Sequence, residues 1–391
     1  MSHTEKQLKM RDLGVEASYL AACSLHDTVP VLPEEPDWEA LYRFCKFHSI
    51  TSIAAMALEQ VWKEHPADPE VMQKWRQARD KAIRKNMLLN AERERLLAYL
   101  ESIGCWYMPL KGSLLQFDYP KFGMRQMSDN DILCDPAHSA DIRGYMTENG
   151  YTCVQYMQGH HDEYNRKPVY NFEIHRSLFK KEEAPVLAAY YEDIRDRALT
   201  DGGKEYGHHL SVSDFYIYLI AHAYNHFLES GIGIRHLMDV YVFLGQHGTQ
   251  LDWAYAETEL RKLDAWEFSQ LSRRLAQKLF ARPVRMADSE PEELSALDAF
   301  FSSGSHGTEE QLLAKSYEKF RKNGNGSRAG YFLRRLFPPA ELLGVMYPVV
   351  RKHKWMVPFV WIYRLIRSVI NRPGRVLREM KHIAAVKEDK D

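Results

Sequence analysis

Two aspartates separated by one residue, Asp129 and Asp131, are the side chains of this sequence best suited to chemistry. They open an apolar run that reads as a strand, where residues two apart point to the same face with Cα atoms roughly 6–7 Å apart. Two carboxylates that close resist joint ionisation unless a cation lies between them. The predicted occupant is a hard divalent ion such as Mg²⁺, which takes oxygen ligands and keeps positions for phosphate oxygens.

A glycine turn precedes the acid pair. Gly112 and Ser113 follow an apolar run that ends at Lys111, where we expect the chain to turn into a helix. Glycine lets the backbone approach a ligand closely, and a helix N-terminus presents free N–H groups suited to phosphate. Arg125, four residues before the acids, offers a bidentate fork for surplus phosphate charge. Residues 107–135 therefore predict a phosphate cradle beside a metal site.

These motifs carry a family resemblance. The segments LKGSLL, SDNDILCD and FEIHRSL, together with Arg125, resemble the uncharacterised nucleotidyltransferases of bacteria, in the DNA polymerase β-like superfamily. The superfamily signature is a hydrophobic residue, Gly-Gly or Gly-Ser, a spacer, and Asp-x-Asp/Glu. Two features depart from it: the spacer from Ser113 to Asp129 has 15 residues, which is long, and Asn130 replaces the usual apolar residue.

The resemblance implies a third carboxylate on a neighbouring strand. Glu173 is the only acid in the alternating run NFEIH, and His175 shares its face. We therefore expect Glu173 to join the two aspartates and His175 to orient it.

The fold implied by the resemblance is α+β. A small mixed-sheet nucleotidyltransferase core at 105–205 would lie between an N-terminal helical region at 1–104 and a C-terminal helical region at 206–391. Helices are expected over Val15–Cys23, Trp38–Lys63, Asp68–Leu100, Ala184–Ala198, Asp214–Leu228, Ile234–Leu244, Trp253–Leu279, Glu290–Phe301, Glu309–Arg321, Ala340–Tyr347 and Met356–Ile370.

The implied activity is Mg²⁺-dependent transfer of a nucleoside monophosphate from an NTP such as ATP to an acceptor hydroxyl, with release of pyrophosphate. The ligands of one or two Mg²⁺ ions would be Asp129, Asp131 and Glu173, and the contacts to the nucleotide would be Lys111, Gly112, Ser113 and Arg125. Antibiotic, sugar, protein side chain and RNA end all remain open as acceptor. The alternative is a non-catalytic nucleotide-binding or scaffold protein on the same fold, because Asn130 and the long spacer leave turnover open.

Four polar residues of the C-terminal helical region are further candidates for nucleotide or acceptor contacts. His222 and His226 lie four apart on one helix, but no glutamate lies between them, which excludes a zinc protease of the HExxH type. Arg235 and Asp239 have the same spacing and predict a helical salt bridge. The resemblance implies that this region closes over the cleft; ordinary packing is the competing interpretation.

The sequence His160-His161-Asp162 contains the His-Asp pair of HD phosphohydrolases. It falls in a segment, Gly159 to Pro168, that reads as a polar loop. HD chemistry needs a helical scaffold with further ligands, so we exclude this function.

Composition limits the partners. The chain has 52 basic and 53 acidic residues, a balance that does not favour a protein gripping nucleic acid over its whole surface. Residues 351–391 hold eleven Lys or Arg against four Asp or Glu, with aromatics between them, a pattern that leaves a nucleic-acid or anionic-membrane surface open. The favoured interpretation is that Phe359, Ile362 and Ile366 pack on preceding helices while the arginines stay in solvent. Five scattered cysteines and the absence of a signal or transmembrane run predict a cytoplasmic protein with reduced thiols.

Overall fold

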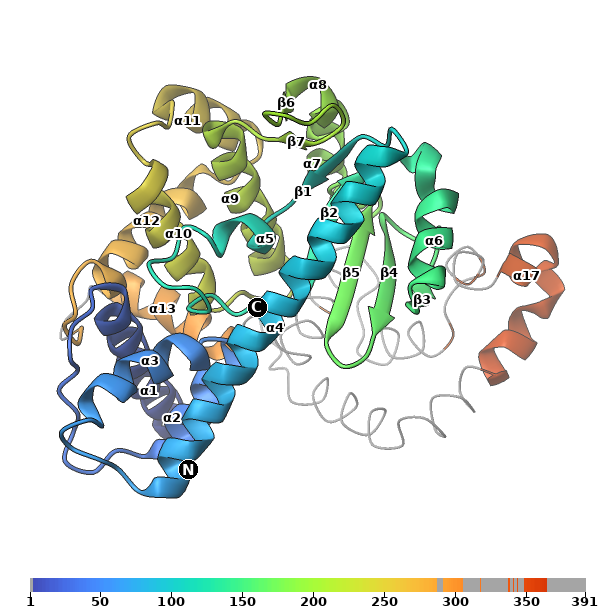
Figure 1. Cartoon of the computed structure of the whole chain (residues 1–391). Coiled ribbons are helices and arrows are strands. Elements are labelled where there is room, and N and C mark those ends of the chain that lie inside the picture. Colours follow the sequence, from blue (N-terminus) through green and yellow to red (C-terminus); the bar gives the residue numbers. More distant parts are fainter. Residues whose placement is uncertain are drawn as a thin grey trace, which may run out of the picture. The chain divides into compact units, whose positions relative to one another are not determined.

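The core of the chain is a five-stranded mixed sheet (Figure 1). The computed structural model describes residues 3–286, 291–304 and 348–363 and positions 317, 337, 340 and 343. Its strands are β1 (Tyr107–Pro109), β2 (Asn130–Cys134), β3 (Thr152–Gln155), β4 (His161–Arg166) and β5 (Tyr170–His175), in the order β1-β2-β5-β4-β3. Strands β2 and β5 are parallel, and the other neighbours are antiparallel. The predicted α+β class with a small mixed sheet is confirmed.

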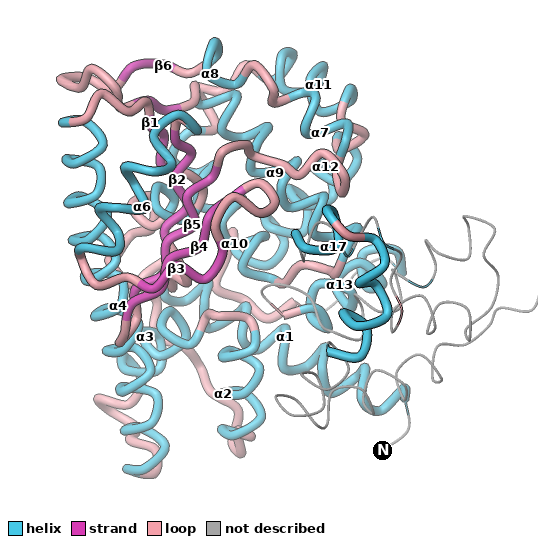
Figure 2. The backbone as a smooth tube through the Cα atoms, turned by 90° about the vertical axis from the view of Figure 1, so that its right-hand side faces the viewer, coloured by secondary structure: helices cyan, strands magenta, loops and turns pink. Residues whose placement is uncertain are grey.

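One face of the sheet is packed against helices α4 (Pro69–Ser102) and α6 (Ser139–Glu148), as Figure 2 shows. The apolar side chains of this face and of the two helices form one core: Ile132, Tyr164, Phe172, Ile174, Leu96, Leu100, Ile142 and Met146. Because strand residues alternate between faces, burying this apolar set fixes the strand register and leaves the polar residues on the opposite face. Helix α9 (Val212–Glu229) lies on that opposite side (Figure 2).

Helices precede, interrupt and follow the strands of the sheet along the sequence. Those before it are α1 (His3–Leu25), α2 (Trp38–Phe47), α3 (Thr51–Val61) and α4, and those within or after it are α5 (Gly112–Leu115), α7 (Pro185–Tyr190), α8 (Ile194–Arg197), α9, α10 (Ile234–His247), α11 (Trp253–Lys262), α12 (Trp266–Phe280) and α13 (Pro291–Ser303). A short ribbon of β6 (Leu199–Thr200) and β7 (His208–His209) occupies the glycine-rich segment before α9. None of the helices in the described ranges has the length and apolar character that a membrane span needs.

Aspartate side chains cap the first turns of α2 and α4. The side chain of Asp37 accepts a hydrogen bond from the Ala40 amide at 3.0 Å, at the start of α2. Asp68 accepts from the Glu70 amide at 2.8 Å and precedes Pro69, the first residue of α4. Both caps satisfy amides that have no partner inside the helix.

Two long predicted helices are each broken in the structure, which corrects the prediction. The expected helix Trp38–Lys63 is α2 and α3, separated at Ser49, and the expected helix Trp253–Leu279 is α11 and α12, separated at Asp264. Ser49 and Asp264 have positive φ, 55° and 54°, the left-handed conformation at which helices commonly end, although the apolar periodicity of the sequence continues. The region Ala184–Ala198 likewise contains two short helices, α7 and α8, and α1 begins at His3 rather than near Val15.

The prediction of a polar loop between Gly159 and Pro168 is wrong. Residues His161 to Arg166 form β4, which pairs with β5 over its whole length. Asp162 and Tyr164 are buried, whereas His161 and Glu163 lie on the polar face. The alternation was hidden because one inward residue is an aspartate. The exclusion of HD chemistry is consistent with this geometry, since adjacent strand residues point to opposite faces.

The chain divides into two compact units, one of residues 1–225 and 232–305 and the other of 226–231 and 306–391. In the second unit, α17 (Pro348–Lys352) belongs to an apolar cluster of Leu343, Val350 and Val360, with Val357 and Trp361 packed against it. Phe359 and Ile362 are exposed, so their predicted packing is wrong. The expected helix Glu309–Arg321, most of the helix Ala340–Tyr347, the end of the helix Met356–Ile370, Ile366 and most of the basic stretch lie outside the described residues. The predicted domain boundaries at 104 and 205 stay a prediction.

Candidate active site

Two of the three predicted acids, Asp131 and Glu173, meet on the polar face of the sheet, and the charge of the third, Asp129, interacts with both. Asp131 of β2 and Glu173 of β5 are register partners across the parallel pair. Ligand atoms of Asp131, Glu173 and His175 all lie within 4.8 Å of one another. Asp129 precedes β2 by one residue and, two residues from Asp131, interacts electrostatically with both other acids. The sheet therefore brings together side chains that lie 44 positions apart in sequence.

Asp129 is the member of this cluster that ionises with most difficulty. Burial, followed by the negative charges of Asp131 and Glu173, raises the pKa of Asp129 to about 6. A hydrogen bond of 3.0 Å from the Ser128 hydroxyl offsets part of that effect. A carboxylate held in this way favours a cation beside it, and the oxygen-rich donor set fits a hard divalent ion such as Mg²⁺.

Asp131 is compensated by the Lys111 cation and by a hydrogen bond with His175. Its Oδ2 lies 3.5 Å from Lys111 Nζ, and its Oδ1 lies 2.9 Å from His175 Nε2. Burial alone would raise the pKa of Asp131, but Lys111 and His175 lower that pKa well below its ordinary value. Burial would lower the pKa of Lys111, but the carboxylates overcome it and raise that pKa. Asp131 is therefore ionised and already partly neutralised.

His175 links the two strands of the site. It is buried, and its Nε2 lies 3.6 Å from Glu173 Oε2 in addition to its contact with Asp131. Burial opposes protonation, but hydrogen bonds to Asp131 and Glu173 raise the pKa of His175. The interaction with His175 lowers the pKa of Glu173 below its ordinary value, although burial and the negative charge of Asp131 each act to raise that pKa. The predicted orienting role of His175 thus has a geometric basis with both acids.

The loop before Asp129 is fastened to α4. The side chain of Asn86 donates to the Arg125 carbonyl at 2.7 Å and accepts from the Met127 amide at 3.1 Å. Lys85 Nζ donates to the Ser128 carbonyl at 2.8 Å. The last residues of the 15-residue spacer between Ser113 and Asp129 are therefore fixed by hydrogen bonds to α4.

Asn130, the unusual residue between the two aspartates, points to the opposite face and contacts α4. It is fully buried, donates to the Leu89 carbonyl at 2.9 Å, and accepts from Arg93 at 3.4 Å. Because α4 supplies both partners, a polar residue is tolerated at this position without exposing it.

The Arg125 guanidinium is paired with a carboxylate and is not free to bind phosphate. Its Nε and Nη2 donate to the two carboxylate oxygens of Asp239 at 2.8 and 3.0 Å, and both side chains are buried. Tyr119 adds a hydrogen bond of 2.7 Å to the same carboxylate. The predicted salt bridge from Arg235 to Asp239 is replaced by this pair, and Arg235 instead donates to the Gln126 carbonyl at 3.4 Å. Phosphate contact by Arg125 stays a prediction.

The glycine turn is closed by contacts of its own. Ser113 donates from its hydroxyl to the Leu110 carbonyl at 2.6 Å and from its amide at 3.3 Å. A Cβ atom on Gly112 would overlap the guanidinium of Arg125, so the close approach requires glycine. Lys111 has a φ of 48°, which turns its side chain out of β1. Nucleotide contacts by Lys111, Gly112 and Ser113 stay predictions.

Helix α9 contributes near the acids. The pKa of the Tyr218 hydroxyl is raised by burial and by the charges of Asp131 and Glu173, and lowered by the cation of Lys111. His222 lowers the pKa of Asp131. His226 follows one turn later in the same helix and belongs to the second compact unit. Of the four additional candidates, His222 therefore has an electrostatic link to Asp131, and Arg235 has one to Asp129.

Two histidines that the sequence analysis set aside also belong to the polar face. His161 pairs with His175 across β4 and β5, and His160 precedes it. Ring nitrogens of His160, His161 and His175 lie within 4.8 Å of one another. The alternation of HDEYNR was the signal that could have identified them.

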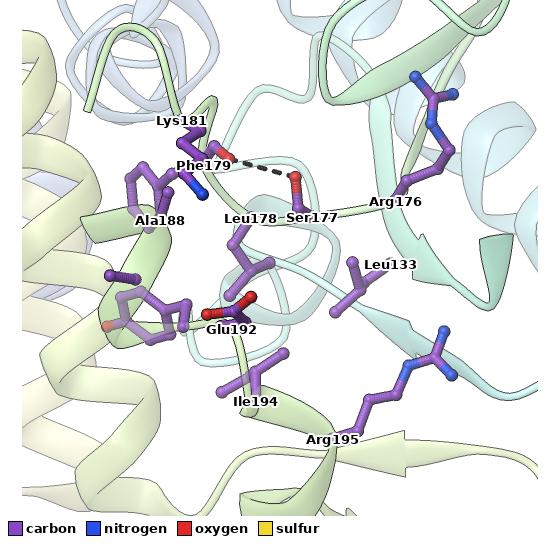
Figure 3. A pocket seen from close by; sticks show the side chains of 12 residues that line it. Leu133, Arg176, Ser177, Leu178, Phe179, Lys181, Ala188, Glu192, Ile194 and Arg195 are labelled. Atoms are coloured by element: carbon purple, nitrogen blue, oxygen red, sulfur yellow. Dashed lines mark hydrogen bonds between the residues drawn. The ribbon is translucent and has the colours of Figure 1, made fainter. Parts of the chain in front are cut away.

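A cavity of about 340 Å³ lies on the same side of the sheet (Figure 3). Leu133, two residues after Asp131 on β2 and paired with His175, forms part of its wall. The rest of the lining combines apolar and charged side chains, including Leu178, Phe179, Ile194, Lys181, Glu192 and Arg195. Such a lining suits a ligand with both an apolar body and polar groups.

A mixed sheet with acids on adjacent strands beside a glycine turn is the core arrangement that the nucleotidyltransferase resemblance implies. The model of the family described as uncharacterised nucleotidyltransferase matches residues 34–281, which is more than half of the chain. The chain belongs to this family of nucleotidyltransferases, and the matched range includes all three acids. A search of curated proteins and a search of solved structures each found no match.

Proposed function

We propose that the protein transfers a nucleoside monophosphate from an NTP, such as ATP, to an acceptor hydroxyl and releases pyrophosphate in an Mg²⁺-dependent reaction. The observation that carries this proposal is the register pairing of Asp131 with Glu173, beside an Asp129 whose pKa is raised by both. Membership of a nucleotidyltransferase family supports the same reaction class.

The acids and the cations of the site would have separate roles. Asp129 and Asp131 would hold Mg²⁺ with the triphosphate, and Glu173 would help to hold a second ion. Mg²⁺ supplies charge neutralisation and lowers the pKa of the acceptor hydroxyl. Lys111, whose Nζ is 3.5 Å from Asp131, is placed to offset charge that develops on the transferred phosphoryl group. Arg125 would reach phosphate only by exchanging its contacts with Asp239.

The cavity beside Leu133 is the proposed acceptor site, because it lies one strand repeat from Asp131 on the same face. Ala188→Trp, on α7, would fill it and should reduce transfer while leaving Mg²⁺-NTP binding intact. Ala254→Trp, at an exposed position of α11, is the matched control. Equal transfer by both variants would remove the cavity from the proposal.

The function is tested by incubating the protein with labelled NTPs, Mg²⁺ and cell extract, and asking which molecule acquires the label. Asp129→Ala combined with Asp131→Ala should abolish labelling and pyrophosphate release without unfolding the protein. Glu148→Ala, at an exposed position of α6, is the control and should behave as the unaltered chain. Undiminished labelling by the double variant would exclude these acids.

The alternative of a nucleotide-binding or scaffold protein makes a different prediction. It expects each NTP to stabilise the fold in the presence of Mg²⁺, with no pyrophosphate released over a broad panel of acceptors. Binding without release would therefore favour the scaffold.

A further inference from the structure

Three histidines converge at one end of the β4–β5 pair. His161 lies directly opposite His175 in the antiparallel register, and His160 is the residue before it. The ring centroids are 4.6 Å apart for His160 and His161, 5.2 Å for His161 and His175, and 5.4 Å for His160 and His175. One nitrogen from each ring lies within 4.8 Å of the others, so small side-chain rotations would bring all three to one ion.

The nitrogen atoms that face one another have the spacing of metal ligands. His161 Nδ1 lies 3.3 Å from His160 Nε2. A tetrahedral ion bound at about 2.0–2.1 Å separates two ligand nitrogens by about 3.3 Å. His175 uses Nε2 for Asp131, and its Nδ1 is buried with no hydrogen-bond partner. A buried nitrogen without a partner is costly, and a ligand would satisfy it.

Carboxylates lie on the other nitrogens of two of these rings. Asp131 Oδ1 is 2.9 Å from His175 Nε2, and Glu173 Oε2 is 3.9 Å from His161 Nε2. Histidines that bind a metal ordinarily donate their second N–H to a carboxylate, which fixes the tautomer and the ring orientation. His175 therefore has the outer carboxylate partner of a metal ligand, whereas Glu173 lies beyond hydrogen-bond distance of His161.

We propose that His160 Nε2, His161 Nδ1 and His175 Nδ1 bind a divalent transition-metal ion, with Zn²⁺ the best chemical match. Three imidazoles leave a fourth tetrahedral position for water or an anionic oxygen, whereas Mg²⁺ prefers oxygen ligands. The ion would fix His161 and His175 and, through their outer nitrogens, the orientation of Glu173 and Asp131. This inference does not depend on nucleotidyl transfer.

The test is equilibrium dialysis of the metal-free full chain against Zn²⁺ in the presence of excess Mg²⁺, with bound zinc measured by mass spectrometry. The unaltered chain and His209→Ala, which changes an exposed histidine of β7, should each bind one tight equivalent. His160→Ala and His161→Ala should weaken that binding at least about a hundredfold, since removing even an outer partner costs 10–100-fold. Zinc affinity that is unchanged in both variants would overturn the proposal.

A second measurement needs no substitution in the histidines. Paramagnetic resonance of Cu²⁺ bound to the unaltered chain should report imidazole nitrogens, and a spectrum with oxygen ligands alone would overturn the assignment. Asp129→Asn separates the two metal sites: zinc binding should persist in it even though the Mg²⁺ site has lost a ligand. Failure of nucleotidyl transfer with retained zinc binding would therefore leave this inference standing.

Discussion

Asp129→Asn should make the metal-free protein more stable while removing its response to Mg²⁺. The negative charges of Asp131 and Glu173, together with burial, oppose ionisation of Asp129 in the folded state. The uncharged amide of asparagine keeps nearly the same shape and can still accept the Ser128 hydrogen bond. It removes one negative charge from the cluster, so the repulsion falls.

The magnitude follows from the shift in pKa. The pKa of Asp129 rises from 3.8 to about 6, and at about 1.4 kcal/mol per unit this corresponds to about 3 kcal/mol against the folded state when the group is ionised. The folded-state pKa lies above the unfolded value, so the penalty is absent below pH 3.8. It grows between pH 3.8 and 6 and is complete above about pH 7. We expect the variant to gain about 1–3 kcal/mol at pH 8, because solvent screens part of the repulsion.

The assay is urea unfolding in chelator at pH 4, 6 and 8, comparing the unaltered chain, Asp129→Asn and Asp193→Asn. Asp193 is exposed and provides the matched control. A second series adds Mg²⁺. A ligand that binds only the folded state at a hundred times its Kd stabilises by about 2.7 kcal/mol, which the unaltered chain should show and Asp129→Asn should not.

Two results would refute this reasoning. The first is an Asp129→Asn variant whose stability advantage over the unaltered chain does not change between pH 4 and pH 8. The second is stabilisation by Mg²⁺ that is as large in Asp129→Asn as in the unaltered chain, which would mean that Asp129 is not a ligand.

Further predictions concern the framework around the site. Asp239→Ala leaves the buried guanidinium of Arg125 without its counter-charge, so the free energy of unfolding should fall by about 3–5 kcal/mol in urea titration; a loss below 1 kcal/mol would contradict a dominant role for this pair. Gly112→Ala should destabilise the protein because its Cβ overlaps Arg125, whereas Gly144→Ala in α6, with open space around it, should be neutral or stabilise by up to about 1 kcal/mol in the same assay. Burial lowers the pKa of His236 to about 4, below its ordinary 6.5, so stability should be lost as the pH falls from 6.5 to 4, by about 3 kcal/mol at most. An acid-unfolding series in which His236→Asn is as steep as the unaltered chain would argue against this origin.

The local parts of the site were predictable from the sequence alone. The spacing of Asp129 and Asp131, the alternation around Glu173 and the capping aspartates Asp37 and Asp68 each depend on contacts within a few residues. Period-two and period-3.6 patterns report such short-range geometry directly, which is why the strands that carry Asp131 and Glu173 could be predicted.

Only the tertiary structure shows which distant side chains and strands pair with one another. Arg125 pairs with Asp239, 114 residues away. The local pattern cannot show that Asp239 pairs with Arg125 and not with Arg235, which lies one helical turn from it. Strand β4, and with it the histidines His160 and His161, was missed because one of its inward residues is an aspartate, Asp162, whose burial only the tertiary structure shows. The helix breaks at Ser49 and Asp264 were hidden as well, because periodicity records which side of a segment is buried but not whether the backbone continues in one direction. Side-chain chemistry and short spacing are properties of the chain, whereas pairing across the sheet and burial of charge exist only once distant segments have met.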